Sequence, residues 1–202
     1  MLDRIPELPA TFLPPEEYAP DATGRFANIE DFFWKLERRQ TFQEEEDASY
    51  RAFMRGDWDE ALRIEDESLG ALRDRFKKAR FEHRRIRVVE LPVTPYLQWE
   101  MQALRVRFDA GERIGVLDVA NKAIRDRERN RILPEVIIVG TEALYEVGYD
   151  QAGVHNGARR IFDQQVISAC RAEMTVLWGK AEDFTTFFAR EIAPLPPPPA
   201  QR

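Results

Sequence analysis

The side chains that could carry acid–base or nucleophilic chemistry are few in this chain and stand far apart. Its two histidines are isolated, because His83 precedes a run of arginines and His155 lies in an expected turn. Acid–base mechanisms need a titrating group beside a second functional group, so isolated histidines are more typical of structural or solvated positions. The single cysteine, Cys170, falls on the apolar stripe of an expected helix, where a thiol behaves as a small hydrophobic group.

Metal-binding and phosphate-binding motifs are missing from the sequence. Histidines, cysteines and carboxylates do not recur at ligand spacing, and the densest acidic run, residues 44–47, is typical of a helix start. None of the ten glycines belongs to a GxGxxG or Walker motif. The sequence predicts neither a metal site nor a cofactor.

Composition and charge narrow the class of protein. The chain has 30 Lys and Arg residues against 36 Asp and Glu residues, a net charge of −6, which disfavours direct nucleic-acid binding. A hydrophobic content of 44% with 11% aromatic residues is typical of a folded chain. No apolar run reaches the roughly 20 residues that a membrane span needs. With one cysteine and no recognisable secretory signal, we expect a cytoplasmic protein without disulfides or a membrane anchor.

Basic residues give the first functional signal. Residues 73–87 contain eight Lys or Arg residues and few acids, which makes the stretch a candidate contact for an anionic ligand or an acidic partner. The alternative is a charged outer face whose strand-end arginines pair with Glu82 and Glu90.

Aromatic residues beside charges give the second signal, in residues 32–38 and in an expected helix that starts at Pro95. We expect the arginines to bind an anionic group by forked hydrogen bonds, Tyr96 and Trp99 to form apolar walls, and Glu100 to orient an arginine. The alternative interpretation is that Trp34 and Trp99 are buried in the core and contact no ligand. The predicted ligand-binding residues are Trp34, Lys35, Glu37, Arg38, Arg85, Arg87, Tyr96, Trp99, Glu100 and Arg105.

The spacing of hydrophobic residues, which predicts the elements that position these side chains, changes from helical to strand-like near residue 85. Residues 44–55 and a longer stretch from Asp57 to Ala79 have helical spacing. A β-branched run at 85–90 predicts a strand, Thr94 and Pro95 predict the start of a helix that Gly111 ends, and residues 113–119 predict a second strand. This order fits a right-handed βαβ crossover with parallel pairing.

The rest of the chain predicts further strands and a last helix. Residues 135–139 form an expected third strand, 143–149 and 158–162 a hairpin, and Asp163 caps a C-terminal helix. Residues 121–131 fit either a loop or a short exposed helix. The fold class is therefore α/β, near the α+β boundary, with a mixed sheet of four or five strands flanked by helices.

Prolines delimit the expected domains. We expect an extended N-terminal arm (1–24), a helical subdomain (25–84), an α/β domain (85–190) and a disordered Pro-rich tail (191–202). The arm carries too many apolar residues for a solvated segment. It is expected to lie in a hydrophobic groove of its own domain or of a second copy, which leaves a homodimer open.

Several segments resemble a known family. They are FWKLERRQTF (33–42), RIRVV (85–89), and residues 92–96 followed by Trp99 and Glu100. They resemble an actinobacterial family known as domain of unknown function 6879, over most of residues 25–190. The resemblance implies no activity. It implies a regulatory or accessory protein that often accompanies a helix-turn-helix regulator.

A weaker resemblance concerns the scaffold. The strand order, Gly111-Glu112, Leu133-Pro134 and Leu177-Trp178 resemble half of a phospholipase-D-like domain. The catalytic members of that superfamily use HxKxxxxD, in which the histidine is the nucleophile and the lysine binds phosphate. Neither histidine here has a lysine two residues later, so the resemblance implies a scaffold without phosphodiesterase activity.

The leading function is a non-catalytic ligand-sensing or protein-interacting accessory protein, with its site where the crossover strands end. The alternative is an enzyme acting on a small anionic or amino-acid-like substrate, with Glu37 or Glu100 as general acid or base and Arg87 as anchor. The sequence leaves open whether the protein catalyses a reaction, and its residues favour a protein without catalytic activity.

Overall fold

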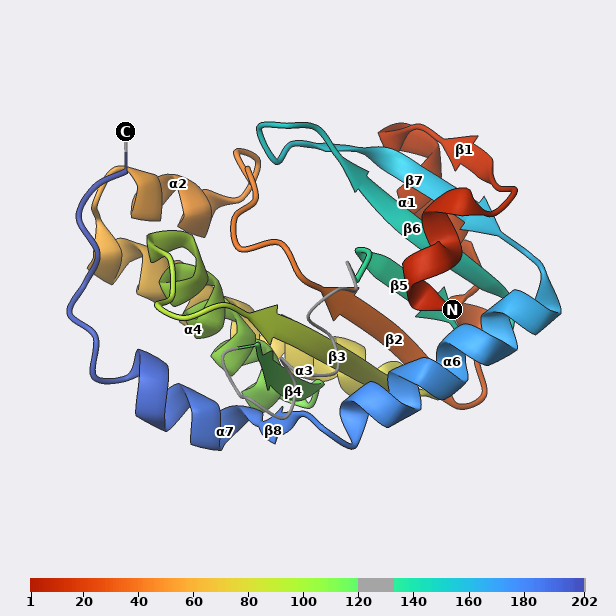
Figure 1. The fold of residues 1–202 in the computed structure, drawn as a ribbon. Coiled ribbons are helices and arrows are strands. Elements are labelled where there is room, and N and C mark those ends of the chain that lie inside the picture. Colours follow the sequence, from red (N-terminus) through yellow and green to blue (C-terminus); the bar gives the residue numbers. More distant parts are fainter. Residues whose placement is uncertain (120–132, 202) are drawn as a thin grey trace.

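One mixed sheet organises the chain. The computed structural model describes residues 1–119 and 133–201, and in these ranges eight strands pair in the order β1-β7-β6-β5-β2-β3-β4-β8 (Figure 1). Strands β2, β3 and β4 are parallel, and every other neighbouring pair is antiparallel. The strands are β1 (Thr11–Leu13), β2 (Phe32–Glu37), β3 (Glu82–Val89), β4 (Arg113–Asp118), β5 (Val136–Val139), β6 (Ala143–Tyr149), β7 (His155–Ile161) and β8 (Glu182–Asp183).

The mixed α/β class is confirmed, and the expected four or five strands are too few. Strands β1 and β8 have only 3 and 2 residues, too short to produce a periodic pattern. Strand β2 was hidden for another reason. Its sequence FFWKLE places charged residues in a strand that lies between β3 and β5, where alternation of polar and apolar residues does not mark a solvent face.

The predicted strand–helix–strand unit is present. Helix α4 (Pro95–Ala110) connects the parallel strands β3 and β4. The Thr94 hydroxyl accepts a hydrogen bond from the Leu97 amide at 3.0 Å, which caps the helix start. Gly111 follows the last turn with φ of 121°, a conformation that favours glycine.

For the remaining helices, the predicted starts match the structure more often than the predicted lengths do. Asp57 and Asp163 cap α3 (Trp58–Lys78) and α6 (Gln164–Trp178) as predicted. Helix α2 (Ala48–Met54) begins later than expected, because the Asp47 side chain accepts from the Tyr50 amide at 2.9 Å. The shorter elements are η1 (Leu2–Glu7), α1 (Pro15–Gly24), η2 (Phe26–Asn28), α7 (Phe184–Phe187) and η3 (Phe188–Ile192).

Helices cover both faces of the sheet. Helix α6 and η1 pack against Trp34, Leu36 and Ile86 on one face, the face toward the viewer in Figure 1. On the other face, α4 and α7 pack against β4 and the end of β3, and α1 packs against β6 and β7. Helices α2, α3 and α4 share a fourth cluster, which contains Trp99. No helix in the described ranges is long and apolar enough to cross a membrane.

The first 24 residues are not the extended arm that their prolines suggested. They form η1, β1 and α1, and Pro15 stands in the first turn of α1, where its missing N–H removes no helical hydrogen bond. Leu2 and Ile5 are fully buried against the core of the same chain. The N-terminal segment therefore packs on its own chain, which was one of the two expected locations; the other was a second copy of the protein.

Two other expectations need correction. The range 25–84, expected to be helical, also supplies the central strand β2. The tail, expected to be disordered, lies along the helices, where Gln98 Nε2 donates to the Pro196 carbonyl at 2.7 Å and the Gln201 amide donates to the Met54 carbonyl at 3.1 Å. Proline-rich backbone leaves its carbonyls free to accept such bonds. The domain boundaries stay predictions, and the expectation for residues 121–131 lies outside the described ranges.

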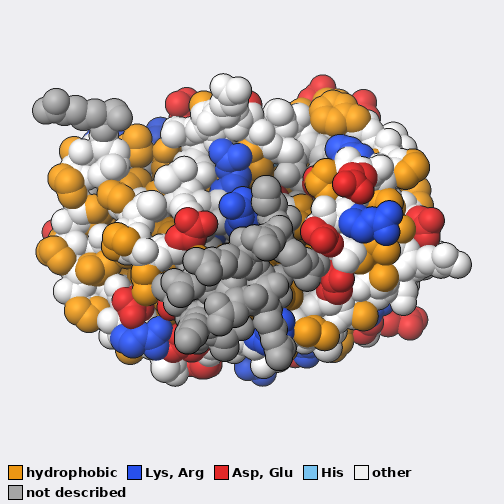
Figure 2. All heavy atoms as spheres, in the orientation of Figure 1, with side chains coloured by type: hydrophobic (Ala, Val, Ile, Leu, Met, Phe, Trp, Pro, Cys, Tyr) orange, Lys and Arg blue, Asp and Glu red, His pale blue; other side chains and the backbone are white. Residues whose placement is uncertain are grey.

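Figure 2 shows the face on which α6 lies. Outside the grey region, acidic and basic side chains are interspersed, and hydrophobic side chains gather at the left, where Figure 1 places α7 and the C-terminal segment. This visible surface shows no broad field of one charge sign.

Candidate functional site

The pairing of β2 with β3 gathers charged side chains beneath α4. Lys35 pairs with Arg85 and Glu37 with Arg87 in the parallel register, so all four side chains leave the sheet on the same face. Glu37, Arg85 and Arg87 are 5%, 6% and 0% exposed. Charges buried to this extent must be paired and hydrogen-bonded.

Arg85 is held between two carboxylates. It forms an ion pair with Glu37, and its Nε lies 2.9 Å from Glu112 Oε1. Glu112 also accepts from Arg107 Nε of α4 at 2.5 Å. Burial would raise the pKa of Glu112, but the charges of Arg85 and Arg107 hold it at about 2. Burial would also raise the pKa of Glu37, but the charges of Arg85, of Lys35 at 2.5 Å and of Arg87 keep it well below its usual range.

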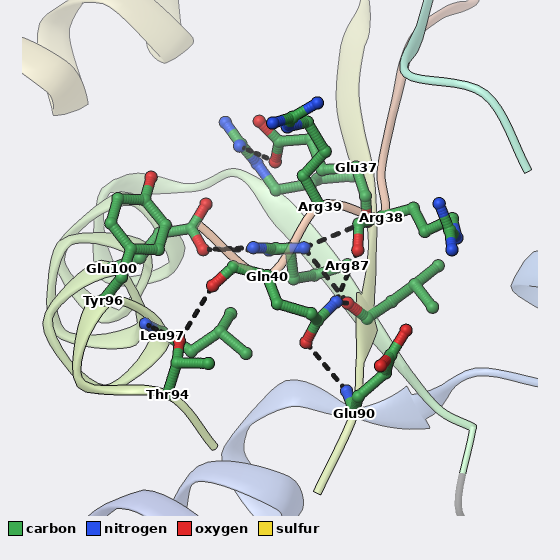
Figure 3. A network of polar contacts seen from close by, with 12 residues as sticks. Glu37, Arg38, Arg39, Gln40, Arg87, Glu90, Thr94, Tyr96, Leu97 and Glu100 are labelled. Carbon is green, nitrogen blue, oxygen red and sulfur yellow. Dashed lines mark hydrogen bonds and ion pairs between the residues drawn. The ribbon is translucent and has the colours of Figure 1, made fainter. Parts of the chain in front are cut away.

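Arg87 is held by α4 and by the main chain. Its Nε and Nη2 donate to Glu100 Oε2 at 2.9 and 2.7 Å, and its Nη1 donates to the carbonyls of Val88 and Glu37 at 3.1 and 3.3 Å (Figure 3). Burial raises the pKa of Glu100 to about 7, and the nearby Glu37 opposes the stabilising charge of Arg87. We call Lys35, Glu37, Arg85, Arg87, Glu100, Arg107 and Glu112 the buried ion network.

Gln40 locks the segment after β2 onto this network. Its Nε2 donates to the Val88 carbonyl at 3.0 Å and its Oε1 accepts from the Glu90 amide at 2.9 Å. Its own carbonyl accepts from the Thr94 hydroxyl at 2.8 Å, so one glutamine connects the end of β3 with the start of α4 (Figure 3). Sequence reasoning gave Gln40 no role.

Tyr96 closes the network on the helix side. Its hydroxyl donates to Glu44 at 2.5 Å, and burial raises the pKa of the Glu44 carboxyl. Glu44 belongs to the acidic run assigned to a solvated helix start, but it precedes α2 and contacts α4 instead.

The structure separates the predicted ligand-binding residues instead of joining them in one surface. It brings together Lys35, Glu37, Arg85, Arg87, Tyr96 and Glu100, but as an enclosed network. Arg38 follows β2, and Figure 3 shows its side chain pointing away from the Arg87–Glu100 pair. Arg105 lies on the outer side of α4, 2.8 Å from Asp66 of α3.

The two tryptophans belong to the core, as the alternative interpretation held. Trp34 points to the opposite face of the sheet, with its ring centroid 5.6 Å from that of Trp178. Trp99 is 2% exposed, and its Nε1 donates to Ser49 Oγ at 2.8 Å. Most of the predicted residues are therefore buried and do not form one exposed basic and aromatic surface, and their role in binding a ligand stays a prediction.

A different part of the basic stretch lines a pocket between the C-terminal end of α3 and the start of β3. The cavity measures about 470 Å³. Three cations stand around it, Arg75, Lys78 and Arg80, and none of their side chains forms an ion pair or hydrogen bond with another described residue. We call it the α3–β3 pocket, and its lining residues are Phe26, Ala27, Arg75, Lys78, Ala79, Arg80, Phe81 and His83.

His83 lies in the wall of this pocket among four phenyl rings. It is 6% exposed, and the rings of Phe26, Phe33, Phe76 and Phe81 have centroids between 4.7 and 6.3 Å from the imidazole. Burial lowers the pKa of His83 to about 4, so the imidazole is neutral at neutral pH. Its ring nitrogens form no hydrogen bond with a described residue.

Sequence reasoning missed much of both groups. The alternation Arg85-Ile86-Arg87 inside a β-branched strand was a sign that both arginines face a covered side and need partners, which Glu100 and Glu112 supply. The burial of His83 among phenyl rings fits the structural one of its two expected roles, and its place in the wall of a pocket was not predicted. Arg75 and Lys78, three residues apart on a helix, were the sign that both would reach one opening. The described residues hold no group of three or more His, Cys, Asp and Glu arranged for a metal ion.

Comparison with known proteins gives a family and no activity. The family described as "Domain of unknown function (DUF6879)" matches residues 20–189. No curated protein matches the chain.

Proposed function

Because the chain belongs to this DUF6879 family, whose description states no activity, we propose a function from the geometry of the chain itself: it is a non-catalytic, ligand-sensing accessory protein that binds a small anionic ligand in the α3–β3 pocket. The observation that carries the proposal is the contrast between cations. Arg85 and Arg87 of β3 are neutralised inside the protein, whereas Arg75, Lys78 and Arg80 surround a cavity without a partner among the described residues.

The chemistry of the pocket supports binding without catalysis. A general base works best when its pKa lies near the operating pH, and His83, at about 4, binds protons too weakly for that role at neutral pH. Arginine keeps its charge and offers forked donors that match carboxylate and phosphate oxygens. The pocket therefore suits recognition of negative charge.

The test compares two triple variants in a titration with inorganic pyrophosphate. We expect Arg75→Ala/Lys78→Ala/Arg80→Ala to weaken binding by at least about 10-fold, equivalent to about 1.4 kcal/mol. The control, Arg4→Ala/Arg55→Ala/Arg113→Ala, removes the same charge from exposed positions elsewhere. Isothermal titration calorimetry at low and high salt measures both. Equal binding by the two variants, or no binding by the unmodified protein, would contradict the proposal.

A second candidate function, an acid–base enzyme, rests on Glu100. Its pKa of about 7 matches the value that a general acid or base needs. Glu37 is a weaker candidate, because Arg85 and Lys35 keep it ionised. Glu100 is also 6% exposed and already bonded to Arg87, so a substrate would have to displace that arginine. A reaction that Glu100→Gln abolishes, while Arg80→Ala leaves it intact, would favour the enzyme over the sensor.

The wider expectations from the sequence join this proposal. The phospholipase-D-like scaffold, the actinobacterial origin and the cytoplasmic location stay predictions. A sensor needs a recipient for its signal, so the proposal includes a partner protein, with a helix-turn-helix regulator as the class that the resemblance implies. A homodimer remains an alternative, and size-exclusion chromatography with light scattering decides between one copy and two.

A further inference from the structure

We infer that the ligand of the α3–β3 pocket carries a planar aromatic ring as well as its negative charge, as a mononucleotide does. The inference rests on the proposed function and deepens it. It follows from three features of the pocket: its aromatic wall, its buried imidazole and its position beside three cations.

The aromatic wall offers ring edges and faces to a planar group. Phe26 and Phe81 meet edge to face, with centroids 5.5 Å apart, and Phe81 lies 4.7 Å from His83 at a tilt of 43°. Both phenylalanines are only partly buried and both line the cavity. Aromatic side chains left accessible in this way bind flat rings by stacking, with little dependence on the identity of the ring.

The imidazole adds a polar contact at the same depth. A neutral histidine has one ring N–H donor and one ring nitrogen acceptor, and His83 uses neither within the described residues. These nitrogens are not among the side-chain atoms that are fully shielded from solvent and lack a partner, so a group bound in the cavity can reach them. The ring nitrogens or exocyclic groups of a heteroaromatic base would supply one, whereas an inorganic anion held at the rim would leave His83 and the phenyl rings unoccupied.

The position of the cations has a simpler explanation than ligand binding, but that explanation does not account for the cavity and its aromatic residues. Lysines and arginines near the last turn of a helix stabilise its negative dipole end, and Arg75 and Lys78 stand in the last turns of α3. That effect requires no cavity and no aromatic residues. The volume of about 470 Å³ falls in the range of small-molecule sites, roughly 300–1,000 Å³, and is larger than one phosphate group needs.

The test uses four probes: adenosine 5′-monophosphate, uridine 5′-monophosphate, ribose 5-phosphate and inorganic pyrophosphate. We expect both nucleotides to bind the unmodified protein at least about 10-fold more tightly than ribose 5-phosphate. Phe81→Leu keeps an apolar side chain and should reduce this preference to less than about 3-fold, while pyrophosphate binding stays unchanged. Phe108→Leu, at another half-buried phenylalanine that packs on Phe184 instead, is the matched control and should keep the preference.

The outcomes separate this inference from the proposed function. Equal affinities for nucleotides and ribose 5-phosphate, or a preference that survives Phe81→Leu, would overturn the aromatic ligand and leave an anion-binding pocket. Failure of all four probes to bind would overturn both. Thermal melting of each variant confirms that it is folded, and His83→Gln provides a second variant that keeps hydrogen-bonding capacity while removing the ring.

Discussion

Two regions of this protein receive cations from the same stretch of sequence and use them in opposite ways. Arg85 and Arg87, on β3, point beneath α4 and are bonded to Glu37, Glu100 and Glu112. A few residues earlier, the α3–β3 pocket has cations that no described side chain neutralises. A run of positive charge in a sequence therefore does not show which charges are available to a ligand.

The difference has an energetic reason. A buried charge is stabilised by its partner. When the partner is removed, the remaining charge stays buried without compensation for its lost hydration, and the folded state is destabilised. An exposed cation remains hydrated and contributes little to stability. Substitutions in the buried ion network should therefore act on folding, and substitutions at the pocket should act on binding.

The largest effect is expected for Arg87→Ala. Removal of the guanidinium leaves Glu100 buried without its partner, and the free energy of unfolding should fall by about 3–5 kcal/mol. Urea denaturation measures the change. A double variant, Arg87→Met with Glu100→Gln, removes both charges and should recover part of the loss. An Arg87→Ala protein as stable as the unmodified one would place Arg87 outside the network and return it to the ligand-binding candidates.

Trp99 sharpens the same contrast for aromatic residues. Trp99→Ala leaves a cavity among α2, α3 and α4 and also removes the donor to Ser49, so we expect a loss of about 3–5 kcal/mol. Trp99→Phe should cost less, because it keeps most of the ring volume. Phe81→Leu, at the pocket, should change stability by much less than Trp99→Ala. A near-neutral denaturation midpoint for Trp99→Ala would show that this ring is not core.

Acid should weaken the buried ion network through Glu112. The pKa of its carboxyl is about 2 in the folded protein, against 4.5 for an unperturbed glutamate, so its contribution is complete above about 4.5 and is lost as the pH falls toward about 2. The lost stability amounts to about 3 kcal/mol. Denaturation at several pH values measures the slope. Glu112→Gln should flatten it, and Glu17→Gln, at an exposed position, should leave it as steep.

The smallest effect is expected for Arg105→Ala. Arg105 pairs with Asp66 at 2.8 Å on the partly exposed outer side of α4, and such pairs contribute less than about 1 kcal/mol. Its melting temperature should stay close to that of the unmodified protein, as should that of Arg80→Ala. A large decrease in melting temperature for either variant would show that the replaced cation stabilises the fold, which would contradict the proposed distinction between buried paired cations and available ones.

Local signals in the sequence located most of the helices and the later strands. The hairpin of β6 and β7 and the crossover around α4 followed from turn residues and from a change of period. The prediction failed for β2, whose charged residues hide a central strand, and for the N-terminal segment, whose prolines predict extended backbone although one of them starts a helix. For the candidate site, the sequence correctly singled out Arg85, Arg87 and Glu100 as related, and it assigned them to a surface that they do not form.

The sequence by itself determined where α3, α4 and α6 begin, because a helix cap depends on a few adjacent residues such as Asp57, Thr94 and Asp163. Only the tertiary structure decided which cations are neutralised. Glu37 comes from β2, Glu100 from α4 and Glu112 from the connection between α4 and β4, and they reach Arg85 and Arg87 because the parallel pairing of β2 with β3 and the packing of α4 bring them there. Arg75, Lys78 and Arg80 stand outside that packing, so their charges stay available.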